Sequence, residues 1–179
     1  MMLSRKNALR ALLGSVFTFP AFGALSPAQR SAVAEFLESH KRSKKYTLAV
    51  FNQMPEEGMD FKPLPEMFTF QRHFAHCIEF VSGQLTARLG IKSPFEGKDL
   101  NKLSKEETKQ ALAQCYDWVE QTVTTATPQQ LAKTGDFGGD QVDLLRLLYI
   151  CENHLIHHRG TTMVYLRMKK IVPEGYVGW

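Results

Sequence analysis

The feature that most constrains this chain is an apolar repeat at three- and four-residue spacing near its C-terminal end. This spacing matches the 3.6-residue turn of an α-helix and differs from the alternation of a strand. A helix with one apolar face must bury that face against neighbouring elements. The repeat predicts a helix over residues 141–169, whose core-facing series is Leu144, Leu147, Leu148, Cys151, His154, Leu155, His158, Thr161, Thr162 and Tyr165.

Three earlier segments carry the start and stop signals of further helices. Ser26, followed by proline, is a good N-terminal cap, and Ser104 with Glu107 forms a capping box. Gly90 is expected to close the helix before it in a left-handed conformation. The predicted helices cover residues 26–53, 69–89 and 104–126.

Four long helices without a strand pattern predict an all-α fold, a four-helix bundle. The connectors after the first and third helices are long enough to cross the bundle, so we expect a connectivity that is not simply up-and-down. Residues 135–140 are rich in glycine, but they lack the lysine and the flanking strand of a phosphate-binding loop. We expect a flexible connector there, with Asp140 capping the fourth helix.

The first 23 residues have the composition of an export leader, with a basic start and then an apolar run. The run is too short for a membrane-spanning helix, so we predict no stable membrane span. We expect an exported, periplasmic protein; if the segment instead packs on the domain as a helix, the protein is cytoplasmic. The chain is therefore divided into a leader, residues 1–23, and one domain, residues 24–179, which is a common size for a single core.

The charge balance gives little support to nucleic-acid binding. The chain has 22 basic and 18 acidic residues, and three of the basic ones lie in the leader, which leaves 19 against 18. The run Lys41–Lys45 spreads around a helix and is interpreted as a solvated face. We therefore expect no nucleic-acid partner.

The three cysteines do not form a disulfide framework, because their number is odd and each lies in an apolar helical pattern. Cys77, Cys115 and Cys151 are interpreted as buried small side chains. Cys151 lies three residues before His154, so a role as a soft metal ligand is the alternative for that residue.

Histidines are the candidate functional residues. His154 and His158 are four residues apart, which stacks two imidazoles on one face of a helix and supplies half of a divalent-metal site. The second helix offers His76 as a third ligand. By helical rotation, His73 and His157 lie 100° or more from these faces, although His73 replaces His76 if the register of the helix differs.

Two segments resemble the DinB/YfiT-like superfamily of metal-binding bundles. The first begins at Met54-Pro55-Glu56-Glu57 and ends at Ala75-His76-Cys77-Ile78. The second is His154-Leu155-Ile156-His157-His158-Arg159-Gly160, followed by Val164-Tyr165-Leu166-Arg167. The order and spacing of both segments are similar to the family pattern.

The resemblance implies a rearranged helix order, a homodimer, and metal ligands at His76, His154 and His158. Thr161 stands where the family usually has glutamine, which removes an amide from the neighbourhood of the site. The candidates for orienting the ligands are Glu79, Asn153 and Tyr165, and no catalytic residue is assigned.

The function expected from this resemblance is that of a metal-dependent enzyme, a thiol-dependent transferase or a hydrolase. Three imidazoles suit zinc or nickel, and iron or manganese are also compatible. The substrate would be a small molecule, with a low-molecular-weight thiol as the second reactant. The alternative is a non-catalytic metal-binding stress-response protein of the same fold.

Overall fold

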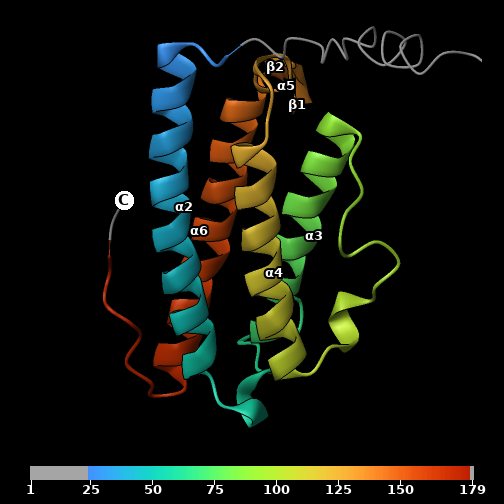
Figure 1. The fold of residues 1–179 in the computed structure, drawn as a ribbon. Coiled ribbons are helices and arrows are strands. Elements are labelled where there is room, and N and C mark those ends of the chain that lie inside the picture. Colours follow the sequence, from blue (N-terminus) through green and yellow to red (C-terminus); the bar gives the residue numbers. More distant parts are fainter. Residues whose placement is uncertain (1–23, 178–179) are drawn as a thin grey trace, which may run out of the picture.

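The computed structural model describes residues 24–177, so the predicted leader lies outside the described part of the chain. Four long helices pack side by side (Figure 1). The all-α four-helix bundle expected from the sequence is confirmed. The helices are α2 (Pro27–Gln53), α3 (Phe70–Leu89), α4 (Lys105–Thr124) and α6 (Leu144–Met168).

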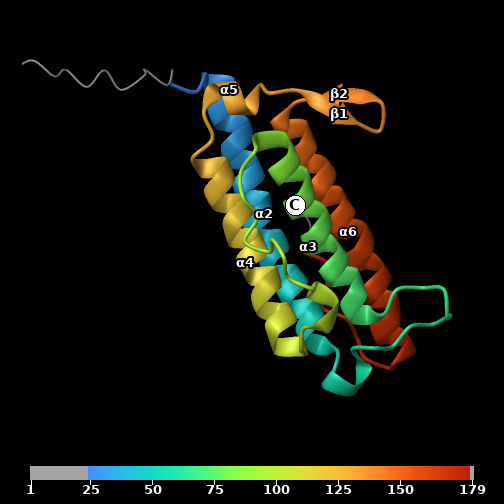
Figure 2. The same cartoon turned by 90° about the vertical axis from the view of Figure 1, so that its right-hand side faces the viewer.

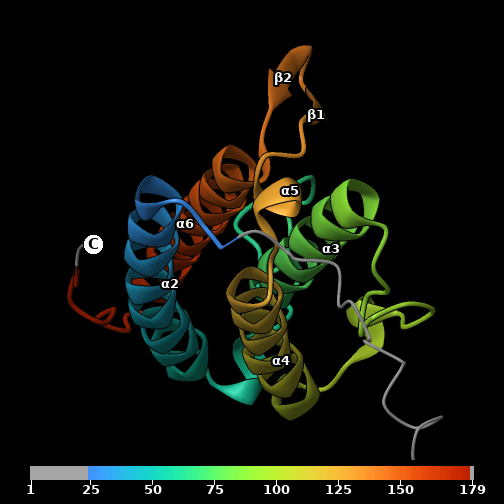
Figure 3. The same ribbon diagram turned by 45° about the horizontal axis from the view of Figure 1, so that its top comes forward.

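The helix order around the bundle is rearranged relative to the sequence. α2 packs against α4 and α6, and α3 packs against the same two helices, so α2 and α3 lie on one diagonal (Figure 3). α2 and α6 run in one direction and α3 and α4 in the other (Figure 1). Simple up-and-down connectivity is therefore excluded, as the sequence predicted.

The connectors explain how this order is reached. Residues 54–69, with the short helix η1 (Glu56–Gly58), and residues 125–143 both join diagonal helices, as expected. In addition, residues 90–104, with η2 (Leu100–Lys102), run back along the bundle between the parallel helices α3 and α4 (Figure 1).

The predicted helix ends agree with the structure at most positions. The side chain of Ser26 accepts a hydrogen bond from the backbone of Gln29, and Ser104 and Glu107 form the expected capping box. Gly90 has φ 71°, the left-handed conformation that closes α3. These caps pair backbone groups that would otherwise lack partners at the helix ends.

The flexible connector predicted at residues 135–140 is wrong. A short helix, α5 (Pro128–Leu131), is followed by an antiparallel hairpin of β1 (Gly135–Phe137) and β2 (Asp140–Val142), which projects from the bundle (Figure 2). Gly138 and Gly139, both at positive φ, form its two-residue turn. Asp140 therefore lies in a strand, and Asp143 caps α6 instead.

One buried cation attaches this hairpin to the bundle. Arg88, near the end of α3, donates hydrogen bonds to the carbonyl oxygens of Lys133 (3.2 Å), Gly135 (3.0 Å) and Val142 (2.6 Å). Backbone carbonyls that would be costly to leave unpaired are satisfied in this way. The hairpin is thus held at its base, on both strands, by a single side chain.

Within residues 24–177, no helix is both long and apolar enough to cross a membrane.

The three cysteines are buried in the apolar interior, as predicted. Burial raises the pKa of Cys77 above its ordinary range and the pKa of Cys115 and of Cys151 to about 12, so none of them is a ready thiolate.

The attachment by Arg88 predicts that position 135 accepts only glycine. A Cβ there would lie 2.8 Å from Nε of Arg88, so Gly135→Ala should displace the guanidinium and lower the free energy of unfolding by about 1–3 kcal/mol. Gly83→Ala is the matched control, because a Cβ on that residue of α3 meets nothing within 4 Å. Chemical denaturation of both variants tests this, and equal stability would contradict it.

Candidate metal centre

Three histidines from two helices converge in the bundle. Each offers a ring nitrogen, and these ligand atoms lie within 4.8 Å of one another. They are the three residues singled out in the sequence: His76 from α3, and His154 and His158 from α6, one helical turn apart. The packing of α3 against α6 therefore brings together segments nearly 80 residues apart in the chain.

The arrangement of the rings fits a cation. The Nε2 atom of His154 is buried and has no hydrogen-bond partner within the described residues. Its ring centroid lies 5.0 Å from that of His76 and 4.5 Å from that of His158. Buried polar nitrogens normally have partners, and a cluster of imidazoles around one that lacks a partner has the donor atoms that suit a divalent metal.

The protonation of the cluster also suits a metal. Burial lowers the pKa of His154 to about 4 and that of His158 to about 3, with neighbouring histidines contributing further. Burial also lowers the pKa of His76, an effect that Arg72 strengthens. Neutral imidazoles are therefore present at pH 7, and only the neutral ring can donate a lone pair to a metal.

The structure corrects the interpretation of His73. Its side chain is buried, and its Nδ1 lies 2.8 Å from Nδ1 of His158. On the other side of the ring, Nε2 lies 3.2 Å from the hydroxyl of Tyr165. His73 does not replace His76 but contacts His158 from behind. Helical rotation showed that it points away from the face of His76; it did not show that α6 would meet it there.

The hydrogen-bond network assigns the protons in this chain of contacts. The hydroxyl of Tyr165 donates to the carbonyl oxygen of Phe68 at 3.1 Å, so its oxygen accepts from Nε2–H of His73. Burial lowers the pKa of His73 to about 4, so the ring is neutral and its Nδ1 is an acceptor. His158 must then donate through Nδ1–H, which leaves its Nε2 with the free lone pair.

Two phenylalanines flank the histidines. Phe80 stacks on His154 with ring centroids 3.9 Å apart and an angle of 15° between the planes. The ring centroid of Phe68 lies 5.3 Å from that of His76 and 6.3 Å from that of His158. Phe137, from the hairpin, packs edge-on against Phe80 at 6.3 Å. These rings fix the imidazoles and keep water away from part of the cluster.

One ion pair lies beside the cluster. Nη1 of Arg72 is 2.8 Å from Oε2 of Glu79, and its guanidinium lies over the ring of Phe68 at 5.1 Å. Both charges act on His76, since the guanidinium lowers and the carboxylate raises its pKa. Glu79, which we considered as a partner of a ligand, is therefore paired with Arg72.

The other candidates of the sequence have different surroundings. Asn153 is exposed, and Thr161 donates to the carbonyl of His157. His157 is exposed too, but its ring packs edge-on against that of His158 with centroids 5.0 Å apart. Tyr165 contacts His73, whose Nε2 lies 3.2 Å from its hydroxyl, and acts on His158 through that ring. Arg159, next to His158 in the sequence, donates to the hydroxyls of Ser43 and Thr47 on α2.

The fold and this cluster together define a class: a rearranged four-helix bundle with three histidines meeting between two of its helices. Among the families of known proteins, the model of the DinB superfamily matches residues 39–162. This range contains all three histidines and more than half of the chain, so the protein belongs to the DinB superfamily.

Solved structures of similar fold agree with this assignment. A DinB-like protein from Bacillus cereus superposes with a TM-score of 0.63 at 22% identity, over 80% of this chain and 97% of its own. A DinB-like protein from Bacillus subtilis gives 0.61 at 20% identity, over 82% and 96%. At these identities the likeness concerns the fold. No curated protein sequence matches the chain.

The contact of His73 with His158 predicts a loss of metal affinity when it is removed. In His73→Phe, the Nδ1–H of His158 has no acceptor, and the ring no longer has a fixed tautomer. We expect metal affinity to fall about 10- to 100-fold. Competition with a chromophoric chelator measures this. His157→Phe, on the exposed side of α6, is the control and should retain the affinity; equal losses in both variants would refute the assigned role.

The lowered pKa values predict an acid-sensitive apoprotein. In the unfolded chain these histidines bind a proton below about their ordinary pKa of 6.5. In the folded protein the pKa is about 3 for His158 and about 4 for His154, so each ring binds its proton only at a lower pH. The unfolded state then binds more protons, so the free energy of unfolding falls as the pH falls through this window. Urea denaturation between pH 7 and 4 tests this, and His158→Phe should show a shallower decline.

Proposed function

We propose that His76, His154 and His158 bind one divalent cation and that the protein is a metal-dependent enzyme acting on a small molecule. The observation that carries this proposal is the convergence of three neutral imidazoles within 4.8 Å, one with a buried, unpartnered nitrogen. Zinc or nickel are the favoured ions, with iron or manganese also compatible with imidazole ligands. When bound, such an ion lowers the pKa of a coordinated thiol or water.

The residues around the cluster favour thiol transfer over hydrolysis. Glu79 is the one acid whose charge acts on the pKa of a ligand histidine in the described structure, and its carboxylate is paired with Arg72. A carboxylate held by arginine is a poor general base. A metal-bound thiol loses its proton without a base, whereas attack by water usually needs one. A thiol-dependent transferase is therefore the preferred reaction class.

The chain's own groups have defined tasks in this proposal. His73 and Tyr165 hold the proton on Nδ1 of His158, so that its Nε2 faces the ion. Phe80 and Phe68 supply an apolar surface for the organic part of a substrate and limit the access of water.

The second candidate is a non-catalytic metal-binding protein, with a role in stress response. The same observation about Glu79 favours it, because the one acid whose charge acts on a histidine of the cluster within residues 24–177 is paired with Arg72. This candidate predicts bound metal without turnover.

We also propose that the protein is an exported homodimer. Val164 and Met168, four residues apart on α6, are 55% and 54% exposed and provide an apolar surface for a second copy. A monomeric mass in sedimentation equilibrium would oppose the dimer, and an intact leader on cytoplasmic protein would oppose export.

The proposed metal centre predicts a stoichiometric divalent ion in the purified protein. Elemental analysis should find about one ion per chain, and His76→Ala should reduce the affinity at least 100-fold, because two imidazoles from one helix leave the site incomplete. His157→Ala should retain the ion. Turnover is measured with a low-molecular-weight thiol and an electrophile. Metal without turnover supports the second candidate, and metal content unchanged in His76→Ala would refute the centre.

A further inference from the structure

A second polar site lies on the other side of α6. A cavity of about 100 Å³ separates α2 from α6, and its lining includes Ser39 and Tyr46 of α2 and Glu152 and Arg159 of α6. A space of this size holds several water molecules or an organic molecule of about five non-hydrogen atoms. It shares no lining residue with the histidine cluster.

Glu152, which lines the cavity, carries an acceptor that lacks a donor. Glu152 is only 2% exposed, and its Oε2 lies 3.3 Å from Nδ1 of His40. Nε2 of His40 lies 3.0 Å from the carbonyl oxygen of Tyr116 and therefore donates to it. The other oxygen of the carboxyl group, Oε1, has no hydrogen-bond partner among residues 24–177. A buried carboxyl oxygen without a donor is costly, so a donor from a bound molecule would be stabilising.

Arg159, which also lines the cavity, carries more N–H groups than its contacts with α2 use. Nη1 of Arg159 donates to Ser43 at 3.0 Å and to Thr47 at 2.9 Å, and its guanidinium stacks on the ring of Tyr46 at 4.6 Å. In the described structure Nε and Nη2 of Arg159 have no such contact. The guanidinium is thus held in a fixed orientation with further N–H groups available, which is the usual way in which a protein prepares a carboxylate site.

The two groups do not satisfy each other. Glu152 and Arg159 are seven residues apart on one face of α6, about 10 Å along the helix axis, and they form no ion pair. A molecule that spans the cavity can reach both groups. It needs an anionic group for Arg159 and an N–H or O–H donor for Glu152.

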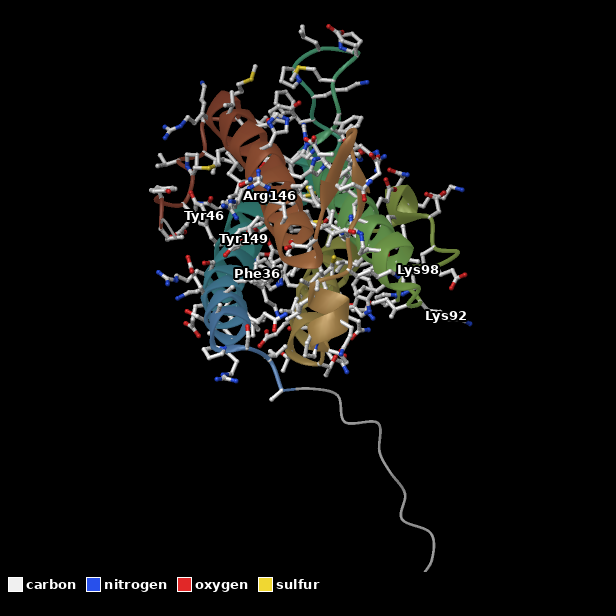
Figure 4. All side chains as sticks on the ribbon, turned by 90° about the horizontal axis from the view of Figure 1, so that it is seen from above. Phe36, Tyr46, Lys92, Lys98, Arg146 and Tyr149 are labelled. Atoms are coloured by element: carbon white, nitrogen blue, oxygen red, sulfur yellow. The ribbon has the colours of Figure 1, made fainter. Side chains whose placement is uncertain are left out.

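The C-terminal segment covers this cavity. Tyr176 and Val177 contribute to its lining. The segment is attached to α2 by three hydrogen bonds. The side-chain amide of Gln53 donates to the carbonyl oxygen of Val172 (3.1 Å) and accepts from the backbone N–H of Glu174 (2.8 Å). The hydroxyl of Tyr46 donates to the carbonyl oxygen of Glu174 at 3.3 Å. Figure 4 shows Tyr46 beside this segment. The cover lies outside the four packed helices, and Tyr176 in it is 83% exposed, so a small molecule can enter without opening the bundle.

We propose that this cavity is a binding site for a small amino- or hydroxy-carboxylate, separate from the metal centre. The carboxylate of the molecule contacts Arg159, and its ammonium or hydroxyl group donates to Glu152. The proposal does not depend on the function of the histidine cluster.

Glycine is the probe, titrated into the chelator-treated full-length protein by calorimetry, with glycolate, acetate and methylammonium as comparisons. Glycine and glycolate carry both groups and should bind. Acetate and methylammonium carry one group each and should bind at least about tenfold more weakly. Acetate that binds as well as glycine, or no saturable binding of glycine up to about 10 mM, would overturn the proposal.

Variants separate the possible explanations. Glu152→Gln keeps the shape of the side chain and should lower the affinity for glycine about tenfold or more. Glu57→Gln, which changes an exposed acid, should leave that affinity unchanged. His76→Ala should leave glycine binding unchanged; its loss would place the probe at the histidines and overturn this proposal alone. In the unaltered protein, the NMR chemical shift of Nε of Arg159 should change when glycine is added. A crystal grown with glycine that holds only waters in the cavity would also refute it.

Discussion

The hydrogen bond between His73 and His158 is the contact on which the rest of the site depends. It forms only when α3 and α6 are packed in one register, because each ring comes from a different helix. Through Tyr165 and the carbonyl of Phe68, it also ties the site to the connector that precedes α3. The orientation of the His158 ring is thus decided in part by backbone outside the helices that carry the three histidines.

Much of the fold could be predicted because its causes are local. Caps such as Ser26 and Ser104 act on backbone groups within one turn, and apolar periodicity indicates which face each helix buries. The hairpin was missed because three-residue strands carry hardly any periodicity, although Gly138-Gly139 is the kind of pair that a two-residue turn requires. The pairing of its two strands is what moved the cap of α6 from Asp140 to Asp143.

In the candidate site, too, the features set by the local sequence could be predicted and those set by helix packing could not. The three histidines could be named from spacing and from resemblance to a family, since both are properties of the chain itself. The contacts of His73, and those of His40 with Glu152, depend on how one helix meets another and have no signal in the spacing of a single helix. α6 therefore carries two polar faces, one toward α3 and one toward α2, where its apolar periodicity predicted a single buried face that also holds a few polar residues.

The hairpin has a consequence for the way this bundle can diversify. It stands outside the packed helices and is fixed at its base by Arg88, yet it sends Phe137 against the ring that stacks on His154. Changes in its length or tip would leave the interior of the bundle intact while altering the wall next to the imidazoles. Sequence changes in this hairpin can thus alter which molecules reach the imidazoles without destabilising the helices that carry them.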